Sequence, residues 1–342
     1  MSSAVVTGAG SALPATIDQD AVWEGYFARH YEGVRAARRI FAGSGVRRRH
    51  AVASPLDEDL SQWSTGARME RYVQEALPLG KQAVAGALDA AGLAPGDVGL
   101  FAVVTCTGYA TPGLDIRLAS DLGMPSGLQR LLVGHMGCYA AIPGLAAVSD
   151  FVTARSRPAV MLCCELTSLH VQPAQADLEQ VVAHALFSDG AAAVVVEPGA
   201  ARGRTVAGIV ARTDHSTADH MTWDVTDLGF RMGLSARVPD VLGRHVGGVV
   251  DELLAGAGLG VEDVAGWAVH PGGPRILDVV RDTLGLAEDQ IAASRRVLAE
   301  HGNCSSATVL LVLEELADVD GPVVAMAFGP GLTLYAALLL PA

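Results

Sequence analysis

The chain has 342 residues, half of them hydrophobic, and a formal net charge of −13. This length allows one large domain or two smaller ones with ample core, and the acidic balance argues against general nucleic-acid binding. No uninterrupted apolar run reaches the roughly 18 residues that span a bilayer. The opening MSSAVVTGAGSALP lacks the basic and apolar segments of a signal peptide. We therefore expect a cytoplasmic protein with neither membrane nor nucleic acid among its partners.

An arginine-rich stretch, VRAARRIFAGSGVRRRH (34–50), stands out early in this acidic chain and contains six arginines. Two interpretations are open. The stretch is either a solvated helix and loop or a phosphate site, because guanidinium groups match phosphate geometry.

Long apolar runs then alternate with helical patterns. Runs that are apolar throughout are typical of strands covered on both faces by helices. They predict strands at 98–108, 159–166, 191–198, 205–214, 264–271, 322–331 and 332–340. Helical periodicity predicts helices at 79–93, 239–259 and 307–319. The predicted fold class is α/β.

The chain has five cysteines, an odd number, and no CxxC pair. This pattern argues against a disulfide framework and against a zinc site. Cys138 differs from the others because it lies in GHMGCYAAIP (134–143), where a helix is expected to begin. A helix N-terminus favours thiolate over thiol. Cys138 is thus a candidate nucleophile, and an inert core cysteine is the alternative.

A second segment repeats this pattern in the other half of the chain. One apolar strand precedes Gly137-Cys138 and its helix, and another precedes Gly302-Asn303 and its helix. The repeat predicts two similar halves, 1–205 and 206–342, whose helix N-termini meet.

His270 is the favoured partner for a reactive thiol. It ends an apolar strand and is followed by Pro-Gly-Gly, a place where α/β folds present site residues. Asn303 is either a plain N-cap or a donor to a developing oxyanion.

Five motifs in this order resemble those of type III polyketide synthases, the chalcone synthase family, from about residue 5 to 340. They are GCYA, ALFSDGAAAVVV (185–196), AVHPGGPRILD (268–278), GNCSSATVL (302–310) and AFGPGLTL (327–334). The resemblance implies a thiolase fold, in which two duplicated α/β halves pack as a five-layer αβαβα core. It also implies a homodimer and a Cys–His–Asn triad at Cys138, His270 and Asn303.

The resemblance further implies the reaction. An acyl-CoA starter is loaded on the cysteine, malonyl-CoA is decarboxylated repeatedly, and each carbanion extends the bound chain before cyclisation. No metal or redox cofactor is expected. The segment HMTWDVTDLGFRMGLSARVP (220–239) is similar to bacterial alkylpyrone and alkylresorcinol producers, so we expect an aliphatic starter and a pyrone or resorcinol product.

By the same resemblance, Phe187 matches a gatekeeper between the CoA tunnel and the inner cavity, and Phe230 matches its partner. Cys106, His170 and Ser305 fall at cavity-lining positions. Ordinary core packing is the alternative for the two phenylalanines.

Basic CoA-binding positions of the family are mostly absent. Arg39 matches one of them, whereas the other two fall on Ala36 and Gly43.

Three alternative functions stay open. One is a tetrahydroxynaphthalene-type synthase that uses malonyl-CoA alone, since a second pocket cysteine at 106 resembles such enzymes. Another is an initiating ketoacyl synthase or acyltransferase of the same fold. The motifs HPGG and GPGLT favour the polyketide synthase over this alternative. The last is a catalytically silent interaction protein, against which Cys138, His270 and Asn303 argue.

Overall fold

The strands form two β-sheets that meet along a short seam. In the computed structural model, which describes residues 3–342, nine strands hydrogen-bond in one continuous order, and the central pair β1–β8 shares the residue pairs Val5–Thr205 and Val6–Arg204. The first sheet, from its edge to the seam, consists of β5 (Gln129–Gly134), β4 (Leu100–Thr105), β6 (Ala159–Glu165), β7 (Gly190–Pro198) and β1 (Ala4–Ala12). The second sheet, from the seam to its edge, consists of β8 (Arg204–Thr213), β13 (Thr333–Pro341), β12 (Val323–Gly329) and β11 (Gly266–Val269).

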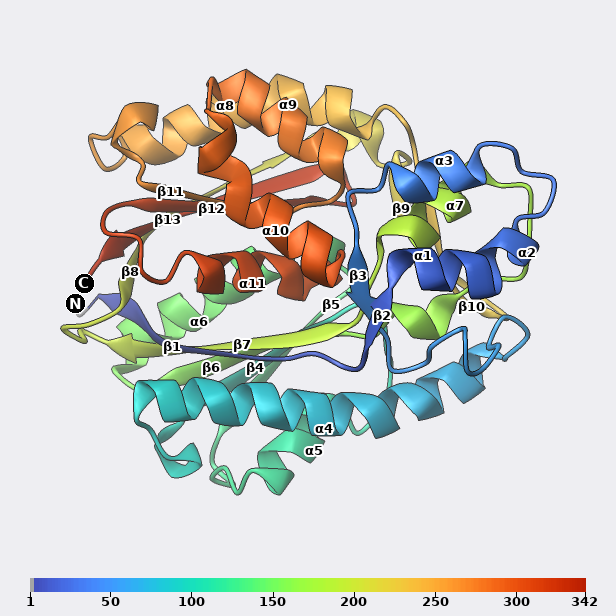
Figure 1. Ribbon diagram of the computed structural model, residues 1–342. Helices are drawn as coiled ribbons and strands as arrows, with labels where there is room; N and C mark the ends of the chain where they lie inside the picture. Colours follow the sequence, from blue (N-terminus) through green and yellow to red (C-terminus); the bar gives the residue numbers. More distant parts are fainter. Residues whose placement is uncertain (1–2) are drawn as a thin grey trace.

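Helices lie outside and between the two sheets, so the molecule has five layers (Figure 1). The outer layers are α4 (Thr65–Ala91) with α5 (Leu114–Asp121), and α8 (Val238–Ala255) with α9 (Pro274–Leu284). The central layer is α6 (Ala141–Arg155) with α11 (Thr308–Glu315), and α10 (Ala292–His301) leads into α11. One buried apolar cluster joins the central helices to strands of both sheets. The expected five-layer αβαβα arrangement is confirmed.

The two sheets share a pattern of strand directions. In the first, β4 and β6 are parallel, and β7 and β1 follow antiparallel. In the second, β11 and β12 are parallel, and β13 and β8 follow antiparallel. This symmetry agrees with two similar halves, although the division into 1–205 and 206–342 stays a prediction.

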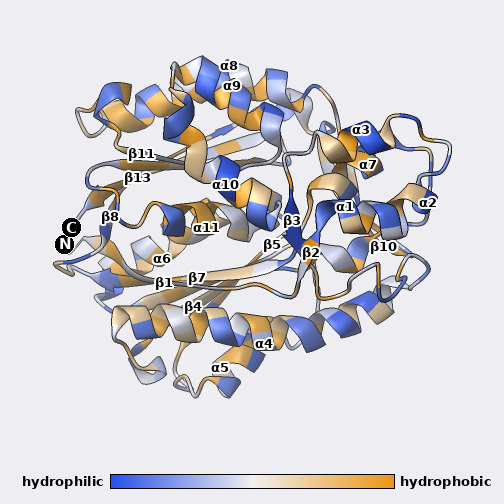
Figure 2. Cartoon of the chain, in the orientation of Figure 1, coloured by the Kyte–Doolittle hydropathy of each residue, from blue (hydrophilic) through white to orange (hydrophobic). Residues whose placement is uncertain are grey.

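Hydrophobicity explains the layers (Figure 2). The strands of both sheets are largely hydrophobic, whereas the outer helix α4 carries hydrophobic and hydrophilic stripes. By length and composition, the segment Gly137–Arg155 is apolar enough to cross a membrane, yet just over half of it is buried inside the protein. Its apolar character is that of a central-layer helix with a sheet on either side.

A smaller group of elements lies beside one end of the layers (Figure 1). The segments from the first part of the chain are β2 (Thr16–Asp18), α1 (Gln19–Val22), α2 (Ala28–His30), α3 (Ala37–Ala42) and β3 (Arg48–His50). They are joined by α7 (Leu178–Leu186) and by the hairpin of β9 (Met221–Thr226) and β10 (Gly229–Leu234). Residues from α1, α3, β3, α7 and the β9–β10 hairpin line the cavities described next.

Candidate active site

Cys138 lies where the chain turns from β5 into the central helix. It belongs to a 3₁₀ turn, Gly137–Tyr139, that runs directly into α6, and 6% of its surface is exposed. Gly137 has φ +76°, and a Cβ there would be 2.8 Å from Cδ of Pro330, so both backbone conformation and space require glycine. The expected helix start at Cys138 is therefore present.

Asn303 lies at the matching turn of the other half, between α10 and α11. Its backbone N–H donates to the Leu186 carbonyl over 2.9 Å, and its carbonyl accepts from the Ser188 N–H over 3.0 Å. Its side-chain Oδ1 accepts from the Ser305 N–H, two residues along the chain, at 2.9 Å and so satisfies a donor at the start of the short helix Ser305–Ala307. Because Oδ1 is engaged in this way, the amide NH₂ group is left to donate elsewhere.

His270 directly follows β11 and is 1% exposed. Neither ring nitrogen has a hydrogen-bond partner among residues 3–342. Buried polar atoms nearly always have partners in folded proteins, so an unpartnered buried imidazole indicates a place where a ligand binds.

These three side chains line one cavity of about 630 Å³, although they come from different elements and from both parts of the chain. Phe187 and Phe328 line it as well. Most of the remaining wall is apolar and comes from α7, the β9–β10 hairpin and α8: Leu178, Val182, Leu186, Met221, Met232, Leu234, Val238, Pro239 and Leu242.

Burial dominates the electrostatics of the site. It raises the pKa of Cys138 to about 12, although hydrogen bonds from Ser305 and Asn303 act in the opposite direction. Burial also lowers the pKa of His270 to about 3. Burial thus disfavours the charged form of both groups. Loss of hydration at Cys138 therefore opposes the preference for thiolate that a helix N-terminus provides.

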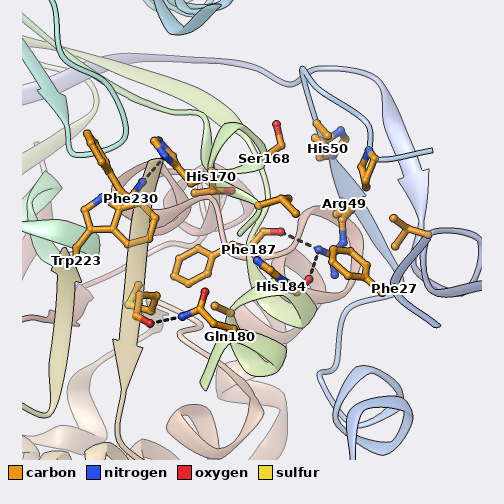
Figure 3. Close-up of a pocket in the computed structure, with 17 residues that line it drawn as sticks. Phe27, Arg49, His50, Ser168, His170, Gln180, His184, Phe187, Trp223 and Phe230 are labelled. Carbon is orange, nitrogen blue, oxygen red and sulfur yellow. Dashed lines mark hydrogen bonds between the residues drawn. The ribbon is translucent and has the colours of Figure 1, made fainter. Parts of the chain in front are cut away.

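Phe187 lines both the large cavity and a second, small one of about 50 Å³. Figure 3 shows the residues around the small cavity. The small cavity is walled by His170, Phe230 and Trp223. The His170 ring stacks on Phe230 with centroids 4.5 Å apart, and Nδ1 accepts from the Phe230 N–H at 2.9 Å. His170 and Phe230 thus fill most of the inner space rather than line an open chamber.

Arg49 holds Phe187 in place, a role that the sequence did not indicate. Its guanidinium is buried and donates to the carbonyls of His184 at 2.6 Å and Phe187 at 3.1 Å, as Figure 3 shows. It also donates to the Ala185 carbonyl at 2.8 Å. Both interpretations of the arginine-rich stretch fail for this residue, because it is buried and its guanidinium is engaged by backbone carbonyls.

Cys106 and Ser305 lie behind Cys138. Within the part of the chain that the structure describes, they line neither of the two cavities. The Cys106 Sγ is 3.7 Å from the Ser305 Oγ, and the Cys106 N–H donates to Glu165 at 3.0 Å. Glu165 was not among the expected site residues. It follows the Cys163-Cys164 pair at the end of β6, and burial raises its pKa.

Arg39 lines the large cavity from α3 and is exposed. A second exposed arginine, Arg275 at the start of α9, lines the same cavity. Arg275 lies in the motif AVHPGGPRILD (268–278), but the sequence did not indicate that this residue lines the cavity.

Comparison with known proteins gives consistent matches along the whole chain. The N-terminal domain model of chalcone and stilbene synthases matches residues 2–200, and the C-terminal domain model matches residues 209–341. The 1,3,6,8-tetrahydroxynaphthalene synthase of Streptomyces peucetius subsp. caesius is 39% identical over 306 residues, which cover 86% of this chain and 80% of that protein.

A second relative is the alpha-pyrone synthesis polyketide synthase-like Pks18 of Mycobacterium tuberculosis. It is 32% identical over 314 residues, which cover 86% of this chain and 80% of that protein. Among solved structures, the 1,3,6,8-tetrahydroxynaphthalene synthase of Streptomyces coelicolor A3(2), a bacterial type III polyketide synthase, matches with a TM-score of 0.93 at 28% identity. The match covers 98% of this chain and 99% of that chain.

Proposed function

Because the chain belongs to the chalcone and stilbene synthase family and is a type III polyketide synthase, we propose that Cys138, His270 and Asn303 are its catalytic residues. The observation that carries this proposal is their convergence on one cavity, where His270 is buried with both ring nitrogens free. Such an imidazole can accept a proton and donate one within the same cycle.

Loading of the starter uses Cys138 and His270 together. His270 accepts the thiol proton as the Cys138 sulfur attacks the carbonyl carbon of an acyl-CoA thioester. A bond forms from Sγ to the acyl carbon, the bond from that carbon to the CoA sulfur breaks, and His270 returns the proton to the departing CoA thiolate. The Asn303 amide donates to the oxyanion that forms at the carbonyl oxygen.

In the extension step, His270 and Asn303 stabilise a different negative charge, that of an enolate. Malonyl-CoA loses CO₂ by breaking its bond to the carboxylate carbon, and the electron pair remains as an enolate on the thioester. The N–H groups of His270 and Asn303 donate to that enolate oxygen. The enolate carbon then attacks the acyl carbon on Cys138, so that a carbon–carbon bond forms and the Cys138 sulfur leaves.

For the starter, we favour an aliphatic acyl-CoA and release of a pyrone or resorcinol. The apolar wall of the 630 Å³ cavity supports this choice, because burying an alkyl chain there contributes roughly 0.8 kcal/mol per CH₂ group.

A tetrahydroxynaphthalene-type product from malonyl-CoA alone is the second candidate. Two observations favour it: Cys106 lies beside Ser305, and the 1,3,6,8-tetrahydroxynaphthalene synthase of Streptomyces peucetius subsp. caesius is 39% identical.

Turnover with a panel of acyl-CoAs separates the two candidates. With malonyl-CoA present, we expect medium- and long-chain acyl-CoAs to yield products whose mass equals the acyl starter plus a few two-carbon units. Product mass spectrometry measures this directly. If malonyl-CoA alone gave a pentaketide naphthalene and fatty acyl-CoAs gave nothing, the second candidate would replace the first.

The protein is proposed to act as a homodimer in the cytoplasm, where CoA thioesters are made. Strand β5 is a sheet edge, and Leu132 on it is 51% exposed. The neighbouring Tyr109 is 63% exposed and lines the same shallow hollow as Leu132. Apolar side chains along an open edge favour pairing with a second copy. Light scattering at the mass of a single chain would contradict this state.

A further inference from the structure

Arg39 and Arg275 are both unpaired cations at the cavity that holds Cys138 and His270. Neither side chain hydrogen-bonds or forms an ion pair with any residue between 3 and 342, and both are exposed. Nearby arginines behave differently. Arg38 pairs with Asp20 at 2.9 Å, and Arg295 pairs with Asp278 at 2.7 Å. The two unpaired arginines are therefore not explained by internal ion pairs.

The two arginines lie on the same rim. Arg39 is in the last turn of α3, and the chain after it leads through Gly43 and Ser44, which also line the cavity. A Cβ on Gly45 would lie 3.9 Å from Cβ of Pro274, the residue before Arg275. The loop that follows α3 thus lies close to the start of α9, and both arginines line the cavity where these two segments meet.

The position of Arg275 is unfavourable for helix α9 itself. It is the second residue of that helix, and the first turn contains no acidic side chain. A cation there opposes the helix macrodipole, whose positive end lies at the N-terminus. Helix stability therefore does not account for Arg275, whereas a bound anion would relieve the repulsion.

The charge of the whole chain makes such local cations important. With a net charge of −13, the protein repels an anionic substrate at long range. Among residues 3–342, Glu179 is the one carboxylate that lines the cavity, and it accepts a hydrogen bond from the Leu234 N–H at 2.9 Å. The cavity wall consequently has two arginines without a partner, whereas its glutamate already accepts a hydrogen bond.

We propose that Arg275 binds the phosphate groups of CoA thioesters together with Arg39, as a two-arginine site at the cavity mouth. This inference rests on the proposed function, in which such thioesters are the substrates. Guanidinium groups form charge-assisted, bidentate hydrogen bonds with phosphate. The nucleotide is held at the rim, and the apolar cavity leads the thioester inward to His270 and Cys138. Two positions that are basic in the family are Ala36 and Gly43 here, and Arg275 supplies a positive charge that these residues lack.

Decarboxylation of two malonyl thioesters tests the proposal without knowledge of the starter. Malonyl-CoA carries the phosphates, whereas the malonyl thioester of N-acetylcysteamine has the same reacting group and none. For Arg275→Gln we expect KM for malonyl-CoA to rise roughly tenfold, with kcat changed less than twofold. KM for the N-acetylcysteamine thioester should change less than twofold. The Arg39→Gln/Arg275→Gln double variant should raise KM for malonyl-CoA further and flatten its dependence on salt.

Arg212→Gln is the matched control, because Arg212 is exposed, pairs with Glu252 at 2.8 Å and lies outside the cavity wall. It removes the same charge and should leave KM for malonyl-CoA unchanged. The proposal is overturned if Arg275→Gln leaves that KM unchanged, or raises KM equally for both thioesters. A wild-type protein that decarboxylates neither thioester would instead contradict the proposed function, so the two failures are distinguishable.

Discussion

Cys138→Ala should abolish polyketide formation, by more than about 10⁴-fold, while the protein stays folded. The thiol carries the growing chain in the proposed mechanism, and among the described residues that line the cavity no other can form a thioester. Removing one buried sulfur costs only about 1–2 kcal/mol of stability, because the cavity that it leaves is small. Product mass spectrometry and a thermal melt measure the two effects separately.

Other cysteines provide the matched controls for this prediction. Cys106 and Cys304 are both buried free thiols near the site. Intact-protein mass after exposure to an acyl-CoA should show an adduct that survives Cys304→Ala and disappears in Cys138→Ala. Labelling that maps to Cys106 or Cys304 would show that the nucleophile has been misassigned.

A further variant separates chain loading from decarboxylation. Cys138→Gln places a neutral amide where the acyl thioester would be, so it cannot be loaded but resembles the loaded state. We expect it to release CO₂ from malonyl-CoA without forming any polyketide.

Sequence patterns were sufficient to predict strands that are apolar on both faces. Examples are β4 and β6, which are buried along their full lengths. The same patterns did not predict β1, because its two glycines, Gly8 and Gly10, are typical of loops. The structure gives the reason for them: a Cβ on Gly8 would lie 2.3 Å from the Ala87 carbonyl oxygen, and one on Gly10 would lie 2.4 Å from the Ala87 nitrogen. Helix α4 packs too closely for side chains there, and such proximity is not visible in one sequence.

The inner pocket shows a different limit. The resemblance named His170 and Phe230 as pocket positions, but it could not show that their rings stack and leave only about 50 Å³ beside them. Their packing depends on the β9–β10 hairpin, which supplies Trp223, and on Arg68, which is fully buried and binds the carbonyls around Leu169. Long-range contacts of this kind decide whether a position lines a space or fills it.

The arginine-rich stretch shows how one composition serves several purposes. Arg49 is buried against the backbone around Phe187, Arg47 and Arg48 pair with Glu300, and Arg39 faces the cavity. Charge and spacing alone did not separate these roles, because burial is set by where β3 packs. The same holds for Cys138, whose position at a helix start was predictable but whose raised pKa follows from burial.

His270 and Asn303 should fail in different ways, because only His270 can take a proton. His270→Ala should lose both loading and decarboxylation. His270→Gln keeps an N–H donor but has no basic nitrogen, so it should lose loading while retaining part of the decarboxylation. Adduct formation on Cys138 and CO₂ release from malonyl-CoA measure the two steps separately. Full loading by His270→Gln would exclude His270 as the base.

Asn303 requires a variant that separates its two contacts. Asn303→Ala removes both the amide donor and the Oδ1 acceptor that caps the Ser305 N–H at 2.9 Å. Asn303→Asp keeps an oxygen acceptor for that cap and removes the amide. Loss of one oxyanion donor slows a reaction by about 10²–10³-fold, so both variants should decarboxylate malonyl-CoA that much more slowly. If Asn303→Asp decarboxylated at the wild-type rate and only Asn303→Ala were slow, Asn303 would act as a helix cap, and the enolate would depend on His270 alone.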